Sequence, residues 1–91
     1  LIARDGRVDV VAATAAGLFY GAQTVKQLVD GTATTARVHG VRVRDWPAMR
    51  WRGVQDDLSR GPVPTLDFMK KQVRTLAAYK GNVYAPYMEQ T

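Results

Sequence analysis

Residues able to bind a polar ligand gather in two short stretches of the second half of the sequence. The first stretch holds Asp57, Ser59 and Arg60, and the second holds Tyr87, Glu89 and Gln90. Arginine and carboxylate groups hold hydroxyls through charge-assisted hydrogen bonds, and an aromatic ring can lie against a sugar ring. The two stretches therefore predict a clamp for sugar hydroxyls. An equally good interpretation is a structural ion pair between Arg60 and Asp57.

Few residues in this sequence could support other kinds of chemistry. It has no cysteine and a single histidine, His39, so we expect no disulfide, thiol nucleophile, metal site or cofactor. The neighbouring Asp56 and Asp57 would point to opposite faces of a strand, which argues against an acid–base pair. Arg52 is the expected partner of the carboxylate that faces inward. His39 has no visible partner and is interpreted as a surface or sheet histidine, not a catalytic residue.

The overall composition is that of a folded protein with a basic surface. Apolar residues make up 46% of the 91 residues, and 13 Lys and Arg against 8 Asp and Glu give a net charge of +5. The basic residues are scattered, with no run longer than two, which favours a solvated surface over a nucleic-acid partner. No apolar run approaches the roughly 18 residues that span a bilayer.

The first half of the sequence predicts strand, helix and strand. Residues 7–13 and 37–44 have the alternation and β-branched content of strands, and residues 15–30 have helical spacing. The predicted apolar stripe of the helix consists of Leu18, Ala22, Val25 and Val29. Gly31 suits a helix C-terminal cap, and Gly17 and Gly21 would let the helix approach a strand closely. Pro47 marks a boundary, and the flanking Trp46 and Trp51 are expected to pack there.

The second half predicts a strand–helix–strand unit. Residues 50–58 and 82–88 are the predicted strands, and the helix begins after the capping residue Thr65 and closes at Gly81. Strands joined by a crossover helix are normally parallel and their connection right-handed. Because ligand-binding loops follow the C-terminal ends of such strands, both polar stretches are expected at one edge of the sheet.

Three motifs in the sequence carry a family resemblance. Residues 17–24 read Gly-Leu-Phe-Tyr-Gly-Ala-Gln-Thr, residues 52–60 run from Arg-Gly to Asp-Leu-Ser-Arg, and residues 80–84 read Lys-Gly-Asn-Val-Tyr. Together they resemble the family 20 glycoside hydrolases, the β-N-acetylhexosaminidases. The resemblance implies an α/β fold class. Residues 1–45 would be the C-terminal part of a small non-catalytic α/β domain, and residues 46–91 the first strand–helix–strand of an incomplete (β/α)8 TIM barrel.

The resemblance also implies that this chain is part of a longer enzyme, here called the parent protein, and implies an activity for it. Members of this family remove terminal β-linked N-acetylhexosamine from glycans, and the acetamido group of the substrate serves as the nucleophile. Their catalytic aspartate–glutamate pair lies on a later strand, so we expect no catalytic residue in this chain and no activity from the 91 residues alone. Arg60 matches an arginine that binds hydroxyls of the terminal sugar, whereas Arg52 and Asp57 match structural positions.

The end of the second predicted strand departs from the family pattern. Family members have a His-Trp-His-Leu run followed by an aspartate that touches the sugar, and residues 85–90 here read Ala-Pro-Tyr-Met-Glu-Gln. Gln90 stands at the position of that aspartate, with Glu89 one residue earlier, which leaves the sugar specificity open. A family 84 N-acetylglucosaminidase fragment and a non-catalytic carbohydrate-binding module are the alternatives. A truncated chain would self-associate through exposed apolar faces.

Overall fold

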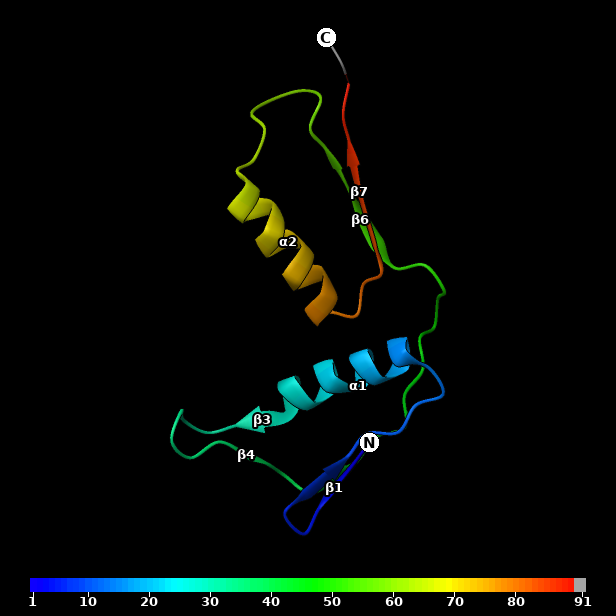
Figure 1. Ribbon diagram of the computed structural model, residues 1–91, viewed down its shortest axis with the longest axis vertical. Helices are drawn as coiled ribbons and strands as arrows, with labels where there is room; N and C mark the ends of the chain where they lie inside the picture. Colours follow the sequence, from blue (N-terminus) through cyan, green and yellow to red (C-terminus); the bar gives the residue numbers. More distant parts are fainter. Residues whose placement is uncertain (90–91) are drawn as a thin grey trace. The chain divides into compact units, whose positions relative to one another are not determined.

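The computed structural model describes residues 1–89 of the chain. They form two compact units that divide after Pro47, and each contains one helix and short strands. Figure 1 shows the order of these elements along the chain. The fold is therefore mixed α/β, and no closed barrel is present within the described residues.

The first unit is built from two small antiparallel sheets and one helix. Its elements are β1 (Ile2–Arg4), β2 (Arg7–Asp9), α1 (Ala15–Leu28), β3 (Val29–Asp30), β4 (Arg37–Val38) and β5 (Val41–Arg42). One sheet has the order β2-β1-β5, and the other pairs β3 with β4. Asp5 and Gly6 join β1 to β2 with φ angles of 51° and 71°. Positive φ at both central residues is typical of a type I′ hairpin turn, for which Asp-Gly is a preferred sequence.

Helix α1 packs through a different face from the one its apolar spacing predicts. Thr14 caps its start by accepting a hydrogen bond from the Gly17 backbone N–H at 3.0 Å. A Cβ on Gly21 would collide with the Val10 side chain, so the missing side chain permits the expected close approach of helix and neighbouring chain. Val25 of the predicted stripe is half-buried, as expected, but Leu18, Ala22 and Val29 are exposed, because the face that carries Gly17 and Gly21 turns inward.

Three other expectations for the first unit need correction. The strand predicted over residues 7–13 ends at Asp9, and the one predicted over residues 37–44 is interrupted between β4 and β5. Gly31 does have a positive φ, 105°, but it does not cap α1. The helix ends earlier because Val29 is already extended and pairs with Val38 of β4.

The second unit has the predicted strand, helix and strand. They are β6 (Gly53–Asp57), α2 (Leu66–Ala78) and β7 (Val83–Tyr87). The two strands are parallel, as predicted, and their register pairs Gly53 with Val83 and Asp57 with Tyr87. Helix α2 lies along one face of the strand pair (Figure 1). The C-terminal ends of both strands therefore lie side by side.

Both ends of α2 are fixed by specific hydrogen bonds. The Thr65 hydroxyl accepts a hydrogen bond from the Phe68 backbone N–H at 3.3 Å, which confirms the predicted cap. At the other end, the N–H of Lys80 donates to the Ala77 carbonyl at 2.9 Å and that of Gly81 to the Leu76 carbonyl at 2.8 Å. This pair of bonds defines a Schellman motif. Lys80, with φ 63°, takes the left-handed position.

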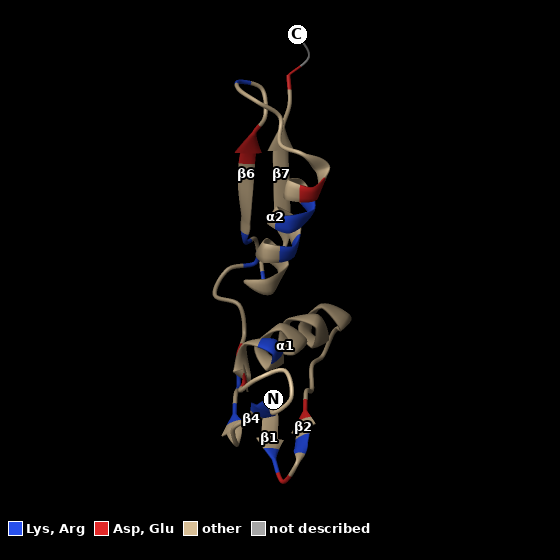
Figure 2. Cartoon of the chain, turned by 90° about the vertical axis from the view of Figure 1, so that its left-hand side faces the viewer, with Lys and Arg blue, Asp and Glu red and all other residues tan. Residues whose placement is uncertain are grey.

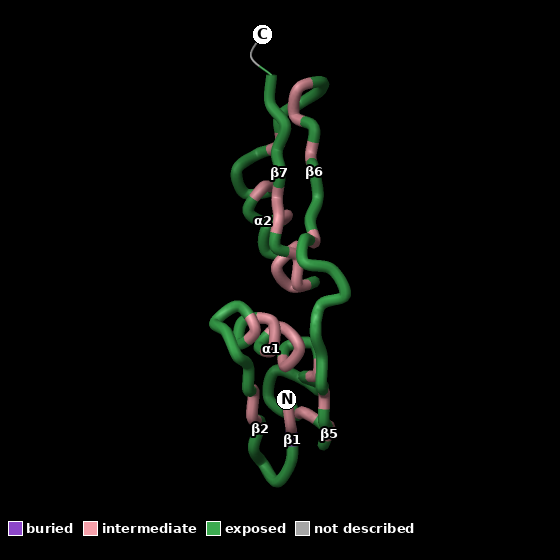
Figure 3. The backbone as a smooth tube through the Cα atoms, turned by 90° about the vertical axis from the view of Figure 1, so that its right-hand side faces the viewer, coloured by how far each residue is buried: buried purple, intermediate pink, exposed green. Residues whose placement is uncertain are grey.

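Neither unit encloses a substantial core. Ala3 is the one buried hydrophobic residue among residues 1–89, and Figure 3 shows the described backbone as almost entirely half-buried or exposed. The accessible surface is 7691 Å², against roughly 6,400 Å² for two separate folded domains of about 5 kDa each. Within the described part, no helix is both long enough and apolar enough to cross a membrane. Both units therefore present apolar surface that further structure would normally cover.

Candidate functional site

The two polar stretches meet at the C-terminal edge of the β6–β7 pair. Asp57 and Tyr87 are partners in the parallel register, and the Leu58 N–H donates to the Tyr87 carbonyl at 2.9 Å, so the pairing continues to the end of both strands. Figure 2 shows the acidic tip of β6, the basic position in the loop after it and the acidic position after β7 at the same end of the pair. The loop after β6 and the segment after β7 therefore share one edge, as predicted.

Asp57 is engaged by its own turn. One carboxylate oxygen, Oδ1, accepts hydrogen bonds from the Ser59 hydroxyl at 2.5 Å and from the Ser59 backbone N–H at 2.9 Å. The hydroxyl bond, followed by the backbone bond, holds the pKa of the Asp57 carboxyl below its ordinary value of 3.8. Among residues 1–89 no ion pair joins Asp57 to Arg60, so the alternative interpretation of these two residues is wrong.

Tyr87 and Glu89 form a second local pair at this edge. The Tyr87 hydroxyl donates to Oε1 of Glu89 at 2.5 Å, and both residues are exposed. This hydrogen bond, with a smaller contribution from desolvation, raises the pKa of the Tyr87 hydroxyl above 10.0. Tyr87 therefore remains a hydrogen-bond donor at neutral pH.

Arg60 lies in the loop that follows Asp57 and is exposed. Its guanidinium makes no ion pair with an acidic side chain in the described part of the chain. A planar group with five donors is therefore available at the edge of the strand pair. Gln90, the remaining residue of the predicted clamp, lies outside the described residues.

Arg52 holds the opposite end of the unit together. Its Nε donates to the Lys80 carbonyl at 2.8 Å, and its Nη1 donates to the carbonyls of Met49 at 2.7 Å and Arg50 at 3.3 Å. The expected pairing of Arg52 with Asp56 is wrong. Because the guanidinium is used at the start of β6, it ties the entry of this strand to the end of α2.

Asp56 instead belongs to a hydrogen-bonded chain that the sequence reasoning missed. Its Oδ2 accepts a hydrogen bond from Gln72 Nε2 at 3.3 Å, and Gln72 Oε1 accepts one from the Tyr84 hydroxyl at 3.1 Å. All three residues are half-buried. Gln72 falls three residues after Met69 on α2, so its place on the inner face could have been read from helical spacing. These hydrogen bonds link β6, α2 and β7 on the face opposite Asp57.

The structure bears on two further expectations about single residues. His39 does have a partner, because its Nε2 lies 3.5 Å from Oδ2 of Asp30 in a solvent-exposed pair. Trp46 and Trp51 are 72% and 66% exposed, and their packing at the boundary stays a prediction. The guanidinium of Arg50 lies over the Trp51 ring, 5.1 Å from its centroid.

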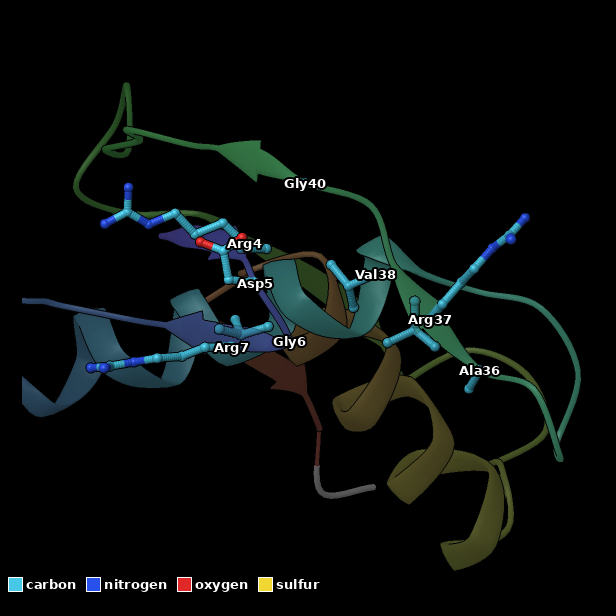
Figure 4. Close-up of a pocket in the computed structure, with 11 residues that line it drawn as sticks. Arg4, Asp5, Gly6, Arg7, Ala36, Arg37, Val38 and Gly40 are labelled. Carbon is cyan, nitrogen blue, oxygen red and sulfur yellow. The ribbon is translucent and has the colours of Figure 1, made fainter.

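Two hollows on the described residues are not lined by the residues of this edge. One of about 380 Å³ lies along α2 and is lined by Leu66, Met69 and Tyr84 among others. The other, of about 500 Å³, is in the first unit between the β1–β2 hairpin and the segment around β4. Figure 4 shows the side chains of Arg4 and Arg7 pointing one way and that of Arg37 the other, so no charged groups converge there. Within the described residues, no three potential ligand side chains gather as a metal site would require.

Comparison with known proteins assigns the chain to a family. The second unit is a parallel strand–helix–strand unit, and in parallel α/β folds the ligand groups follow the C-terminal ends of the strands. Residues 1–46, half of the chain, match the family model described as glycosyl hydrolase family 20, domain 2. The chain therefore belongs to glycosyl hydrolase family 20.

Two relatives extend this assignment beyond residue 46. A beta-N-acetylhexosaminidase of Cellulomonas fimi is 41% identical over 87 residues, which cover 91% of this chain and 17% of the relative. A beta-hexosaminidase of Porphyromonas gingivalis (strain ATCC BAA-308 / W83) is 32% identical over 82 residues, covering 82% of this chain and 10% of the relative. The chain thus spans a small part of these proteins. No solved structure matches it significantly.

Proposed function

We propose that this chain is a segment of a family 20 hexosaminidase that joins two domains. Residues 1–45 are the C-terminal part of the small non-catalytic domain, and residues 46–91 are the first strand–helix–strand of a (β/α)8 barrel. The domain 2 match ends at residue 46, and the compact units divide after Pro47. A barrel of about 250 residues would supply the neighbouring strands that β6 and β7 lack within residues 1–89.

The reaction we propose for the parent protein is removal of terminal β-linked N-acetylhexosamine, GlcNAc or GalNAc, from a glycan. In substrate-assisted hydrolysis, the acetamido oxygen attacks the anomeric carbon while the glycosidic bond breaks and the general acid protonates the departing oxygen. Water then adds at the anomeric carbon, gives its proton back to that acid and releases the acetamido group, with net retention. Asp56 and Asp57 cannot act as the carboxylate pair of this mechanism, because they lie on opposite faces of β6. Following the family resemblance, we assign the catalytic pair to a part of the parent protein outside this chain.

The role of this chain in that reaction is to hold the terminal sugar. The observation that supports it is the parallel register of Asp57 with Tyr87, which brings Arg60, Tyr87 and Glu89 to one edge. Arg60 supplies hydrogen-bond donors, Glu89 supplies acceptors, and Tyr87 adds an aromatic surface. Arg52 and Asp57 serve this site indirectly by fixing the start and the end of β6. The family 20 match supports this interpretation over the family 84 alternative.

The test is hydrolysis of a chromogenic N-acetyl-β-glucosaminide by the parent protein, which is taken as the longest native polypeptide that contains this chain. The parent protein is expected to be active and the 91 residues alone inactive. Arg60→Ala should lower kcat/KM by about tenfold or more, because a charged hydrogen bond to a ligand contributes roughly 1.5–3 kcal/mol. Arg44→Ala, an exposed arginine of the first unit, is the matched control and should leave kcat/KM unchanged.

Each outcome decides a different part of the proposal. If the parent protein hydrolyses neither the glucosaminide nor the galactosaminide, the proposed reaction is wrong, although the family assignment remains. If the parent protein is active and Arg60→Ala behaves like Arg44→Ala, the reaction stands and the placement of Arg60 in the sugar site is wrong.

A further inference from the structure

Two carboxylates lie at the C-terminal edge of the β6–β7 pair, and their hydrogen bonds make them unequal. Oδ1 of Asp57 accepts two hydrogen bonds from Ser59, one of them from the backbone. A carboxylate that binds the backbone two residues ahead forms an Asx turn, which shapes the local chain. Asp57 is therefore used to turn the chain out of β6 toward Arg60.

Glu89 is held differently. The Tyr87 hydroxyl donates to Oε1 alone, through the side chain and without a backbone contact. Residues two apart on an extended chain project to the same side, so the ring of Tyr87 stands beside the carboxylate that it orients. An ionised carboxylate accepts about four hydrogen bonds, and Tyr87 occupies one of these positions. Oε2 of Glu89 therefore keeps its capacity to accept hydrogen bonds from a ligand.

From this difference we infer that Glu89 is the specificity-determining carboxylate of the sugar site and that Tyr87 is its positioning residue. Glu89 accepts a hydrogen bond from one ring hydroxyl of the terminal N-acetylhexosamine, and Tyr87 restricts the carboxylate to the orientation that allows it. The inference rests on the proposed function and deepens it. A site that binds a particular hydroxyl rejects the analogue lacking that hydroxyl, because a charged acceptor is then left unpaired.

The test measures kcat/KM of the parent protein on nitrophenyl N-acetyl-β-glucosaminide and on its 3-, 4- and 6-deoxy analogues. Glu89→Gln should reduce kcat/KM on the complete sugar by about ten- to a hundredfold. On one deoxy analogue it should cause no further loss, because the hydroxyl that Glu89 binds is already absent. Tyr87→Phe should produce a smaller loss with the same pattern, because the carboxylate remains and only its orientation is freed.

Tyr84→Phe is the matched control for Tyr87→Phe. It also removes one hydroxyl from β7, but the Tyr84 hydroxyl donates to Gln72 on the α2 side of the strand pair. It should leave the ranking of the four substrates unchanged.

A second measurement detects the hydrogen bond between Tyr87 and Glu89 independently of enzyme activity. In the parent protein with 13C-labelled tyrosine, Glu89→Gln should lower the pKa of Tyr87, the resonance being assigned by its loss in Tyr87→Phe.

The outcomes separate this inference from the function on which it rests. An active parent protein in which Glu89→Gln lowers kcat/KM equally on all four substrates, or on none, overturns the inference and leaves the proposed function standing. A Tyr87 pKa unaffected by Glu89→Gln overturns the positioning role. A parent protein inactive on every N-acetylhexosaminide overturns the proposed function and the inference together.

Discussion

The two ends of the β6–β7 pair use their polar side chains in opposite ways. At the N-terminal end, hydrogen bonds join residues far apart in the sequence, from Arg52 to the Lys80 carbonyl and from the Asn82 side chain to the Arg50 carbonyl. At the C-terminal end, on the face that carries Asp57, both side-chain pairs join residues two apart. Bonds between distant segments fix the fold, whereas bonds within one segment fix only the shape of that segment.

This difference agrees with the division of labour in barrel enzymes, where one end of the strands supports stability and the other carries the site. The backbone N–H of Arg52 donates to the Asn82 side chain at 2.8 Å, and its carbonyl accepts from the Asn82 N–H at 2.7 Å. Substitutions at this end should therefore change stability. Substitutions at the other end should change ligand binding while the fold persists.

The largest expected effect is that of Gly53→Ala, at the first residue of β6. A Cβ there would collide with the Val83 carbonyl and lie 2.6 Å from the Val83 Cβ. Backbone atoms of a paired strand cannot move aside cheaply, so the substitution should lower the free energy of unfolding by about 3 kcal/mol. Urea unfolding of the parent protein measures it.

Gly40→Ala is the matched control for this substitution. Its new Cβ would meet only the Ala3 carbonyl oxygen at 3.6 Å, an ordinary contact. It should change the free energy of unfolding by less than about 0.5 kcal/mol. Equal effects of the two substitutions would contradict the argument that strand pairing at the N-terminal end requires glycine.

The next largest effect compares two arginines. Arg52→Ala removes three hydrogen bonds to main-chain carbonyls from a half-buried position and should cost about 2 kcal/mol of stability in urea unfolding. Arg60→Ala should change stability by less than about 0.5 kcal/mol, because that guanidinium is exposed. A larger stability loss from Arg60→Ala than from Arg52→Ala would reverse the assignment of the two ends.

Local signals in the sequence predicted the second unit well. Thr65 marked the start of α2. The two strand-like segments that flank the helix were predicted to be parallel, because a helical crossover normally joins parallel strands. The register then brought both polar stretches together. The sequence did not show which groups bind the charged side chains. Arg52 lies at the start of β6 and donates to the Lys80 carbonyl, whereas Asp56 lies near the end of β6 and accepts from Gln72.

The first unit was predicted less well for physical reasons. The Asp5-Gly6 turn carried a hairpin signal that was overlooked, and so β1 was missed. Apolar spacing misplaced the inner face of α1, because close approach through Gly21 outweighed the burial of larger side chains such as Leu18. At the end of α2, Lys80 occupies a left-handed position for which Gly81 was the expected residue.

The smallest expected effect is the pH dependence of Asp57. Its pKa is depressed in the folded protein, so its contribution to stability is present above the ordinary value of 3.8 and is lost as pH falls through the folded value. The difference in unfolding midpoint between the parent protein and Asp57→Asn should therefore be constant at neutral pH and shrink below about pH 4.

Ser59→Ala tests the physical cause of this pH dependence. It removes the hydroxyl that makes the larger contribution to the lowered pKa and keeps the backbone donor, so the loss of stability in acid should be smaller and should be complete at a higher pH. The effect stays small because the carboxylate is exposed and solvent screens it. A difference between parent protein and Asp57→Asn that grows as pH falls would show that Asp57 is tied to more than its own turn. The contrast between the two ends of the strand pair would then not hold for Asp57.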